Sequence, residues 1–228
     1  MVLAVKKLPY RVVEVTPGIG QVAVFRLSGQ RQVPILVHGN NVITDSSSIV
    51  RYLEKMNPEP TLMPKDLQEA AMVTILEDWA DTTMANTSKK LLLKSLSKKP
   101  ELLNALVENE IPQSIKNCIL NIPITIVNEL SVLMDQGEES ELLNSLTQLT
   151  KSIESNNWLV GNSMSFADIA FAAQLSLLKF PASAGTKLSG KGCPGFNDHP
   201  SLQTLFEWRD ELEKTLMEVD PLKITKSI

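Results

Sequence analysis

The chain has 228 residues, of which 43% are hydrophobic and 21% are charged, a balance that is ordinary for a globular protein. This length is sufficient for one large domain or two small ones. The formal net charge is −4 and the lysines are scattered along the sequence, which argues against nucleic acid or an anionic membrane surface as a partner.

The first 27 residues predict three short elements. Residues 1–7 are apolar and then basic, which is typical of the last turns of a buried helix, because lysines are favourable near C-terminal carbonyls. Residues 10–15 (YRVVEV) predict a strand that Thr16, Pro17 and Gly18 end. Residues 19–27 predict a short, irregular helix.

Residues 30–55 (QRQVPILVHGNNVITDSSSIVRYLEK) predict a strand, a hairpin turn, a second strand and a helix. The two short apolar runs are separated by Gly39 and two asparagines, which tolerate the positive φ that tight turns need. Residues 44–46 then offer capping side chains, and the apolar residues that follow recur at helical spacing.

Two features of this segment indicate a binding site. Pro34 stands at the start of a strand, where a cis bond after Val33 would turn the Val33 backbone outward toward a ligand. Asp45 and Ser46 stand at a helix N-terminus, where the helix dipole favours a carboxylate. Together they favour an extended peptide with an acidic end as the ligand.

The rest of the chain is helical in pattern. Three prolines in residues 57–64 indicate a linker, so we expect a first domain over residues 1–57, a linker over 58–65 and a helical domain over 66–221. Helices are predicted over residues 66–96, 112–136 with a break at Pro123, 138–156, 165–180 and 200–219. Residues 181–199 predict a loop, and the tail after Pro221 is expected to be loose.

Ser165 and Asp168 predict a capping box at the start of the helix over residues 165–180. Met164 and Ile169 occupy the positions of a hydrophobic staple beside it. This motif is expected to serve folding rather than catalysis. The three tryptophans are likewise expected to pack in the core or between domains rather than contact a ligand.

Cysteine and histidine are too sparse and too dispersed to predict a metal site or a disulfide framework. Cys118 and Cys193 belong to no CxxC motif, and the two histidines lie far apart. No run approaches the roughly 18 apolar residues of a spanning helix, and the first residues lack the order of a signal peptide. We therefore expect a cytoplasmic protein without a membrane or metal partner.

The spacing from Val33-Pro34 through Asp45-Ser46 to Tyr52 resembles the second half of the thioredoxin-like, glutathione-binding domain of glutathione S-transferases. A second stretch, NNWLVGNSMSFADIAFAAQL, is similar to the capping box in the helical domain of that family. The resemblance implies an α+β or α/β fold class. A thioredoxin-like N-terminal domain without its first strand would precede an all-α C-terminal domain.

The resemblance also implies the residues that would bind glutathione. Ser46 would hold the γ-glutamyl carboxylate, and Asp45 would help with the glutamyl end. Val33, before Pro34, would pair its backbone with the cysteinyl unit, and Gln32 would lie near the glycine end.

The N-terminus departs from the family pattern. Residues 10–15 correspond to the second strand of the family, whose first strand would normally be its parallel neighbour. Either the polypeptide starts upstream of Met1, or the strand pairs directly with the next strand or frays. In both cases the chain from Met1 onward lacks the Ser, Tyr or Cys that stabilises the glutathione thiolate in this family, because the family's position for it precedes Met1, so the catalytic residue is unknown.

The leading hypothesis is a glutathione S-transferase that uses glutathione as co-substrate and conjugates it to, or reduces with it, a small apolar electrophile. The resemblance implies a homodimer and a detoxification role as well. The alternative from another class is a non-catalytic, transferase-like module for binding or assembly. Conjugation activity, measured alongside glutathione binding, discriminates the two.

Overall fold

The computed structural model describes residues 1–15, 19–99, 102, 136–218 and 224–227. The chain divides into an N-terminal unit, Met1–Met63 with Thr215–Ile228, and a helical unit, Pro64–Lys214. The predicted domain limits stay a prediction, and this division departs from them by grouping the last residues with the first. The predicted break at Pro123 and Cys118 lie outside the described residues.

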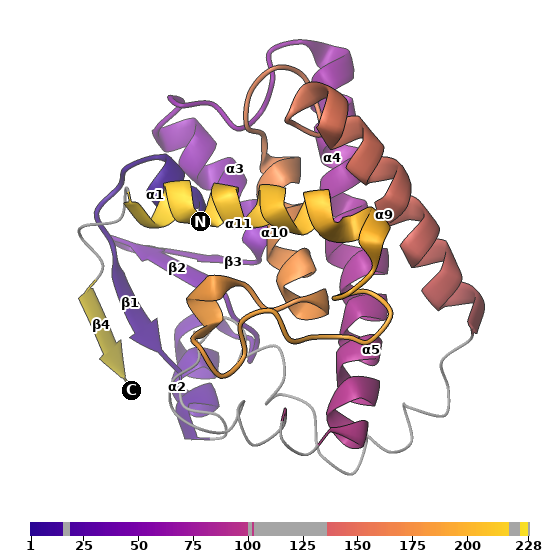
Figure 1. Cartoon of the computed structure of the whole chain (residues 1–228). Coiled ribbons are helices and arrows are strands. Elements are labelled where there is room, and N and C mark those ends of the chain that lie inside the picture. Colours follow the sequence, from indigo (N-terminus) through magenta and orange to yellow (C-terminus); the bar gives the residue numbers. More distant parts are fainter. Residues whose placement is uncertain (16–18, 100–101, 103–135, 219–223, 228) are drawn as a thin grey trace. The chain divides into compact units, whose positions relative to one another are not determined.

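Within its described residues, the N-terminal unit contains short strands and the helices α1 to α3 (Figure 1). Its elements are α1 (Val2–Val5), β1 (Arg11–Glu14), α2 (Ile19–Ser28), β2 (Ile35–His38), β3 (Asn41–Thr44), α3 (Ser46–Met56) and β4 (Ile224–Ser227). The strand, hairpin and helix expected within residues 10–55 are therefore confirmed. The segment predicted as an irregular helix forms a regular α-helix, α2.

The strands β2 and β3 form the predicted hairpin. They are antiparallel, with Ile35 opposite Thr44 and His38 opposite Asn41, which leaves a turn of two residues. Gly39 takes the positive φ (59°) that such a turn requires. The sequence signal was correct here because it depends only on adjacent residues.

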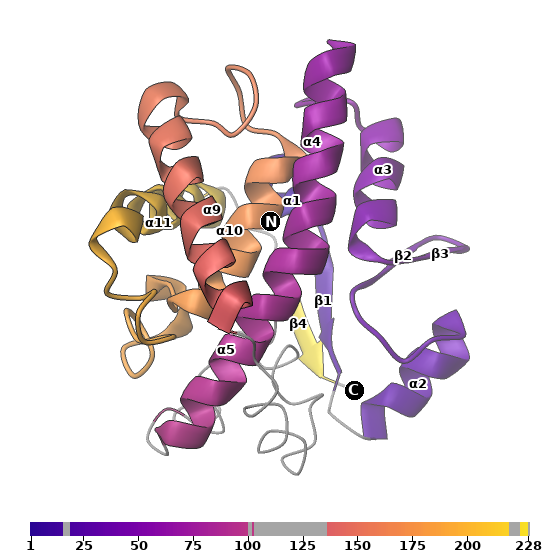
Figure 2. The same ribbon diagram turned by 90° about the vertical axis from the view of Figure 1, so that its right-hand side faces the viewer.

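The C-terminal tail corrects one expectation, because it is not loose where the structure describes it. Ile224–Ser227 forms β4, which pairs in parallel with β1 in the register Arg11 to Ile224 and Glu14 to Ser227. Figures 1 and 2 both show the two strands side by side. The strand for which no parallel neighbour was expected therefore has one, and it comes from the far end of the chain.

Lys6 ties α1 to the end of α3. Its side chain is fully buried, and Nζ lies 2.7 Å from Oε1 of Glu54. The same Nζ donates to the carbonyls of Asn57 (2.7 Å) and Pro60 (3.1 Å). Oε1 of Glu54 also accepts from the N–H of Leu62 at 3.0 Å. This buried ion pair joins segments that are about fifty residues apart.

The helical unit is built around a long helical rod, α4 to α5, with α9, α10 and α11 beside it (Figure 2). Its elements are α4 (Leu67–Trp79), η1 (Ala80–Met84), α5 (Ala85–Lys98), α9 (Gln136–Asn156), α10 (Phe166–Leu178), η2 (Ala182–Ala184), η3 (Pro200–Leu202) and α11 (Gln203–Glu218). One predicted helix over residues 66–96 thus contains a π-helical turn, η1. The last residues of α11, from Thr215, belong to the N-terminal unit.

The core of the helical unit centres on α10, which is buried along almost its whole length. Phe171 of α10 is fully buried and stacks on Trp79 of α4, with ring centroids 5.5 Å apart. Trp208 packs against the same core and donates from Nε1 to the carbonyl of Asn157 at 2.9 Å. Both tryptophans therefore pack, as predicted.

The capping box at the start of α10 is confirmed. The N–H and the hydroxyl of Ser165 both donate to Oδ2 of Asp168, at 2.7 and 2.6 Å. Oδ1 of Asp168 accepts from the N–H of Leu159 at 2.9 Å, which fixes the preceding turn to the helix. Burial raises the pKa of the Asp168 carboxyl, and these hydrogen bonds oppose the shift.

The segment after α10 folds back on the end of that helix. Lys179 forms a bridge with Gly192, and the N–H of Cys193 donates to the carbonyl of Leu178 at 2.8 Å. A Cβ on Gly192 would lie 2.0 Å from that carbonyl oxygen, so the close approach requires glycine. The predicted loop is therefore well packed, although it contains little regular structure.

Candidate functional site

The predicted site begins directly before β2. The peptide bond between Val33 and Pro34 is cis, as expected. Gln32 and Pro34 are exposed and Val33 is half-buried, so all three are accessible at the surface of the N-terminal unit. Gln32 also accepts on its carbonyl from the side chain of Gln30 at 3.4 Å.

Asp45 caps α3 in an unusual backbone conformation. Its φ and ψ are 72° and 135°, and its Oδ2 accepts from the N–H of Ser48 at 3.0 Å. Residues other than glycine rarely adopt a positive φ, and such strain concentrates at functional sites. Asp45 is exposed and Ser46, the first residue of α3, is half-buried. The strain is therefore a second indication that this helix start is a functional site.

The hairpin register brings the two halves of the site together. Ile35 lies opposite Thr44, so the residues just outside that pair, Pro34 and Asp45, lie at the same end of the hairpin. Val33 and Ser46 are their immediate neighbours in the chain, whereas Gln32 lies one residue further out. Pro34 and Asp45 thus flank the last pair of the ladder, and Val33 and Ser46 lie one residue beyond them in the chain.

The charges at this end of the hairpin favour a ligand that carries an ammonium group and a carboxylate on the same carbon atom. Asp45 supplies a carboxylate, which attracts an ammonium group. The N-terminus of α3 at Ser46 supplies the positive end of a helix dipole, which favours a carboxylate. An amino acid end group, with its ammonium and carboxylate, matches this pair of charges.

A cluster of three polar side chains, which sequence reasoning missed, joins the hairpin to α3. The Tyr52 hydroxyl lies 2.7 Å from Nδ1 of His38 and accepts from Nδ2 of Asn41 at 3.4 Å. The rings of His38 and Tyr52 meet edge to face. Because Tyr52 lies 14 positions from His38 and 11 from Asn41, no local pattern could have indicated the cluster.

Cys193 does not provide a reactive thiol. It is buried, and burial raises the pKa of its thiol to about 12. A thiol with such a pKa is almost wholly protonated near neutral pH and is a poor nucleophile. Within the described residues, no three His, Cys, Asp or Glu side chains lie together as metal ligands would.

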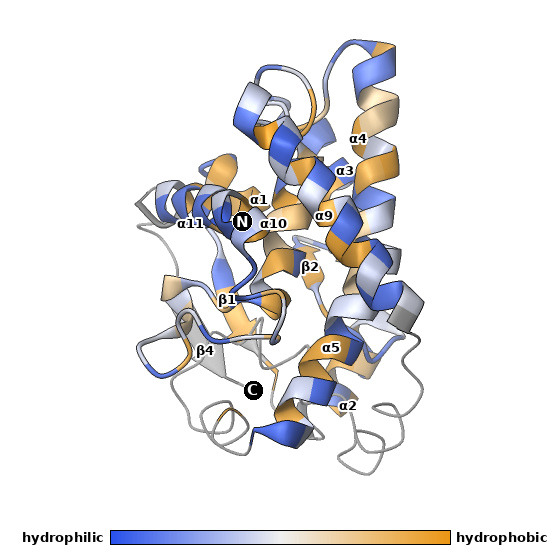
Figure 3. Cartoon of the chain, turned by 45° about the vertical axis from the view of Figure 1, so that its right-hand side comes forward, coloured by the Kyte–Doolittle hydropathy of each residue, from blue (hydrophilic) through white to orange (hydrophobic). Residues whose placement is uncertain are grey.

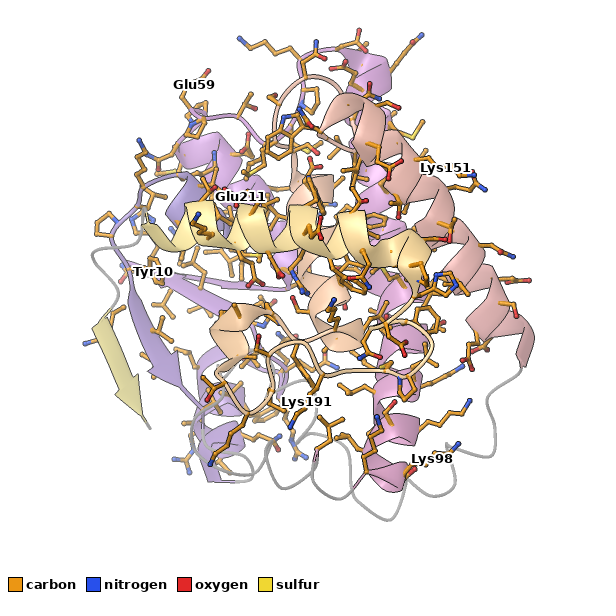
Figure 4. The ribbon with its side chains drawn as sticks, viewed as in Figure 1. Tyr10, Glu59, Lys98, Lys151, Lys191 and Glu211 are labelled. Atoms are coloured by element: carbon orange, nitrogen blue, oxygen red, sulfur yellow. The ribbon has the colours of Figure 1, made fainter. Side chains whose placement is uncertain are left out.

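Positive charge on the helical unit is dispersed. Figure 4 labels Lys98 at the end of α5, Lys151 on α9 and Lys191 in the segment after α10, three exposed residues on three different elements. Lys90 and Lys94 of α5 pair with Glu138 and Glu139 of α9, at 2.7 and 3.1 Å. These four charges therefore neutralise one another.

Comparison with protein-family models gives two matches. The model described as the glutathione S-transferase N-terminal domain matches residues 1–61. The model described as the glutathione S-transferase C-terminal domain matches residues 134–207. Together they cover more than half of the chain.

Curated relatives match over a short segment only. Forty residues are 55% identical to glutathione S-transferase 1 of Dianthus caryophyllus and 50% identical to glutathione S-transferase Z1 of Arabidopsis thaliana. The matched segment spans 18% of this chain and 18% of each relative.

Solved structures match over nearly the whole chain. A glutathione S-transferase from Rhodospirillum rubrum F11 is 23% identical, with a TM-score of 0.59 over 92% of this chain and 79% of that one. FzlA from C. crescentus is 21% identical, with a TM-score of 0.61 over 93% and 80%. Maleyl pyruvate isomerase, a bacterial zeta-class protein, is 18% identical, with a TM-score of 0.59 over 96% and 89%. At these identities the likeness establishes the fold.

Proposed function

The chain belongs to the glutathione S-transferase family, and on this premise we propose that it binds glutathione at the end of the β2–β3 hairpin and reacts the thiol with a small apolar electrophile. Conjugation and glutathione-dependent isomerisation are both reactions of that kind. The observation that carries the proposal is the hairpin register, whose last pair, Ile35 and Thr44, is flanked in the chain by Pro34 and Asp45. Glutathione has an amino acid end group at its γ-glutamyl residue, which is the group that the charges at Asp45 and Ser46 favour.

In this proposal each site residue has one role. Ser46 binds the γ-glutamyl carboxylate through its hydroxyl and the start of α3, and Asp45 binds the ammonium group with the carboxylate oxygen that does not cap the helix. The Val33 backbone pairs with the cysteinyl unit, and Gln32 lies near the glycine end. A hydrogen bond to the sulfur would lower the pKa of the thiol and supply the thiolate for attack. Among the described residues, none is assigned as that donor.

Ser46→Ala is expected to weaken glutathione binding by about 1–3 kcal/mol, because a hydrogen bond to a charged ligand group is lost. Isothermal titration calorimetry measures the effect. Ser47→Ala is the matched control, since it removes the same hydroxyl one position along the helix, about 100° further around it. Equal affinities in the wild type and the Ser46→Ala variant would remove Ser46 from the site.

Turnover must be measured separately from binding. Conjugation of glutathione to a small apolar electrophile by the purified chain is followed as loss of free thiol. Glutathione binding without turnover would favour the alternative, a non-catalytic module. If the chain neither binds glutathione nor turns it over, glutathione is not its ligand.

We also propose that the protein is a homodimer that uses α4. Leu67, Met72 and Ile75 on α4 are 85%, 49% and 62% exposed, which is unusual for large apolar side chains. Met72 and Ile75 are three residues apart and lie on one side of the helix, and Figure 3 shows hydrophobic residues along α4.

Ile75→Asp is expected to convert a dimer into a monomer in sedimentation velocity experiments, because it places a charge in an apolar contact. Gln148→Asp, which introduces the same charge at an exposed position of α9, should leave the dimer intact. A dimer that persists in the Ile75→Asp variant would contradict this role for α4.

We further propose a cytoplasmic location. Cys193 is a free, buried thiol, and free thiols persist in a reducing compartment. Across the part of the chain that the structure describes, helices are too short or too polar to cross a membrane.

A further inference from the structure

β1 is an exposed strand with an unusual partner. Arg11 and Val13 are exposed and Val12 is half-buried, so none of these three side chains is buried. Among the described residues the strands form two separate sheets, β1 with β4 and β2 with β3. Within the described residues, β1 therefore pairs with β4 and with no other strand.

Such a pair has little to stabilise it besides its own hydrogen bonds. Parallel strands are normally buried on both faces, and isolated two-stranded arrangements are marginal in water. β1 and β4 should therefore become ordered together and be lost together. By contrast, α3 and the hairpin are fixed by contacts that do not involve β4, namely the Lys6–Glu54 ion pair and the His38–Tyr52 contact.

The position of β4 in the chain favours pairing within one molecule. α11 ends at Glu218 and β4 begins at Ile224, so only residues 219–223 separate them. A short connection of this kind gives the tethered segment a high effective concentration at its docking edge.

We propose that the edge of β1 is a strand-docking surface whose occupant is the C-terminal segment of the same chain. The segment acts as a strap: it keeps residues 11–14 ordered while bound, and its release frees β1 without unfolding α3 or the helical unit. Docking is by main-chain pairing in the parallel register, as in other cases of strand addition.

The first test removes residues 222–228 and follows amide hydrogen exchange. In a parallel pair alternate N–H groups of a strand point to the partner, so alternate amides of Arg11–Glu14 should exchange at least about tenfold faster in the shortened chain. Amides of α3 and α5 should exchange at unchanged rates. Unchanged exchange in β1, or equal acceleration in α3, would overturn the proposal.

A pair of proline variants tests the register in the full-length chain. Successive N–H groups of a strand point to opposite sides, so only one of Thr225→Pro and Lys226→Pro removes a hydrogen bond to β1. The other should be tolerated, because proline also favours extended backbone at the residue before it. The two variants should therefore differ in β1 exchange, one resembling the shortened chain and one the wild type. Equal exchange in the two would overturn the docking register.

Discussion

Replacing Asp168 with alanine is expected to lower the free energy of unfolding of the helical unit by about 3–5 kcal/mol, because three donors, two of them buried, would lose their acceptor at about 1–3 kcal/mol for each buried donor. The donors are the N–H and hydroxyl of Ser165 and the N–H of Leu159. Asp168 and Ser165 are almost completely buried, so water cannot readily replace the carboxylate. Urea denaturation followed by circular dichroism measures the change.

Two serine variants are the controls for the stability loss expected in Asp168→Ala. Ser165→Ala removes the hydroxyl but keeps the Asp168 contacts to the two N–H groups, so a loss of about 1 kcal/mol is expected. Ser163→Ala changes an exposed residue and should alter stability by less than about 0.5 kcal/mol. If Asp168→Ala costs no more than Ser165→Ala, the carboxylate does not connect the turn to α10 as described.

Lys6→Met is expected to destabilise the N-terminal unit by about 3–5 kcal/mol, because it leaves the Glu54 carboxylate without its cation in a poorly solvated position. It also leaves the carbonyls of Asn57 and Pro60 without their donor. Methionine retains the apolar stem of the lysine, so lost packing contributes little. Proteolysis within residues 1–63, compared with urea denaturation, would locate the loss in this unit.

The charge explanation can be separated from a general intolerance of change at α1. Adding Glu54→Gln to Lys6→Met removes the unpaired charge, so the double variant should be more stable than Lys6→Met alone. Lys7→Met alters the exposed neighbour and should be nearly neutral. A double variant less stable than Lys6→Met would show that the ion pair is not the cause.

The elements that were predicted correctly depend on neighbouring residues. Gly39 and the asparagines beside it mark the hairpin, and Ser165 with Asp168 marks the start of α10, each within four positions. The candidate site was predictable for the same reason. Pro34 directly precedes β2 and Asp45 directly precedes α3, and the limits of both elements are set by neighbouring residues. Asp45 was predicted as a helix cap, whereas its positive φ was not, since no rule at that position distinguishes a strained aspartate from an ordinary one.

The features that were missed depend on residues far apart in the chain. Lys6 looks like a lysine at the end of its own helix, yet it binds Glu54 and the carbonyls that follow α3. β4 is four residues long, and its strand is defined by its pairing with β1, more than 200 residues away in the chain. The hydrophobic pattern of residues 66–96 likewise did not predict the π-helical turn η1. Tertiary contacts decided each of these cases, and a local pattern cannot report them.

The π-helical turn η1 allows this protein to differ in length by one residue from relatives with a continuous helix. A π turn holds one residue more than an α turn, so the extra residue is taken up within the turn and the helices on either side keep their orientation. Deleting one residue from Ala80–Met84 is therefore expected to leave a continuous α-helix in which Leu92 and Leu96 still face the core that they share with α10, whereas a deletion within α5 would rotate the residues beyond it by about 100°. In alignments with distant relatives, single-residue gaps along this rod should accordingly fall within η1.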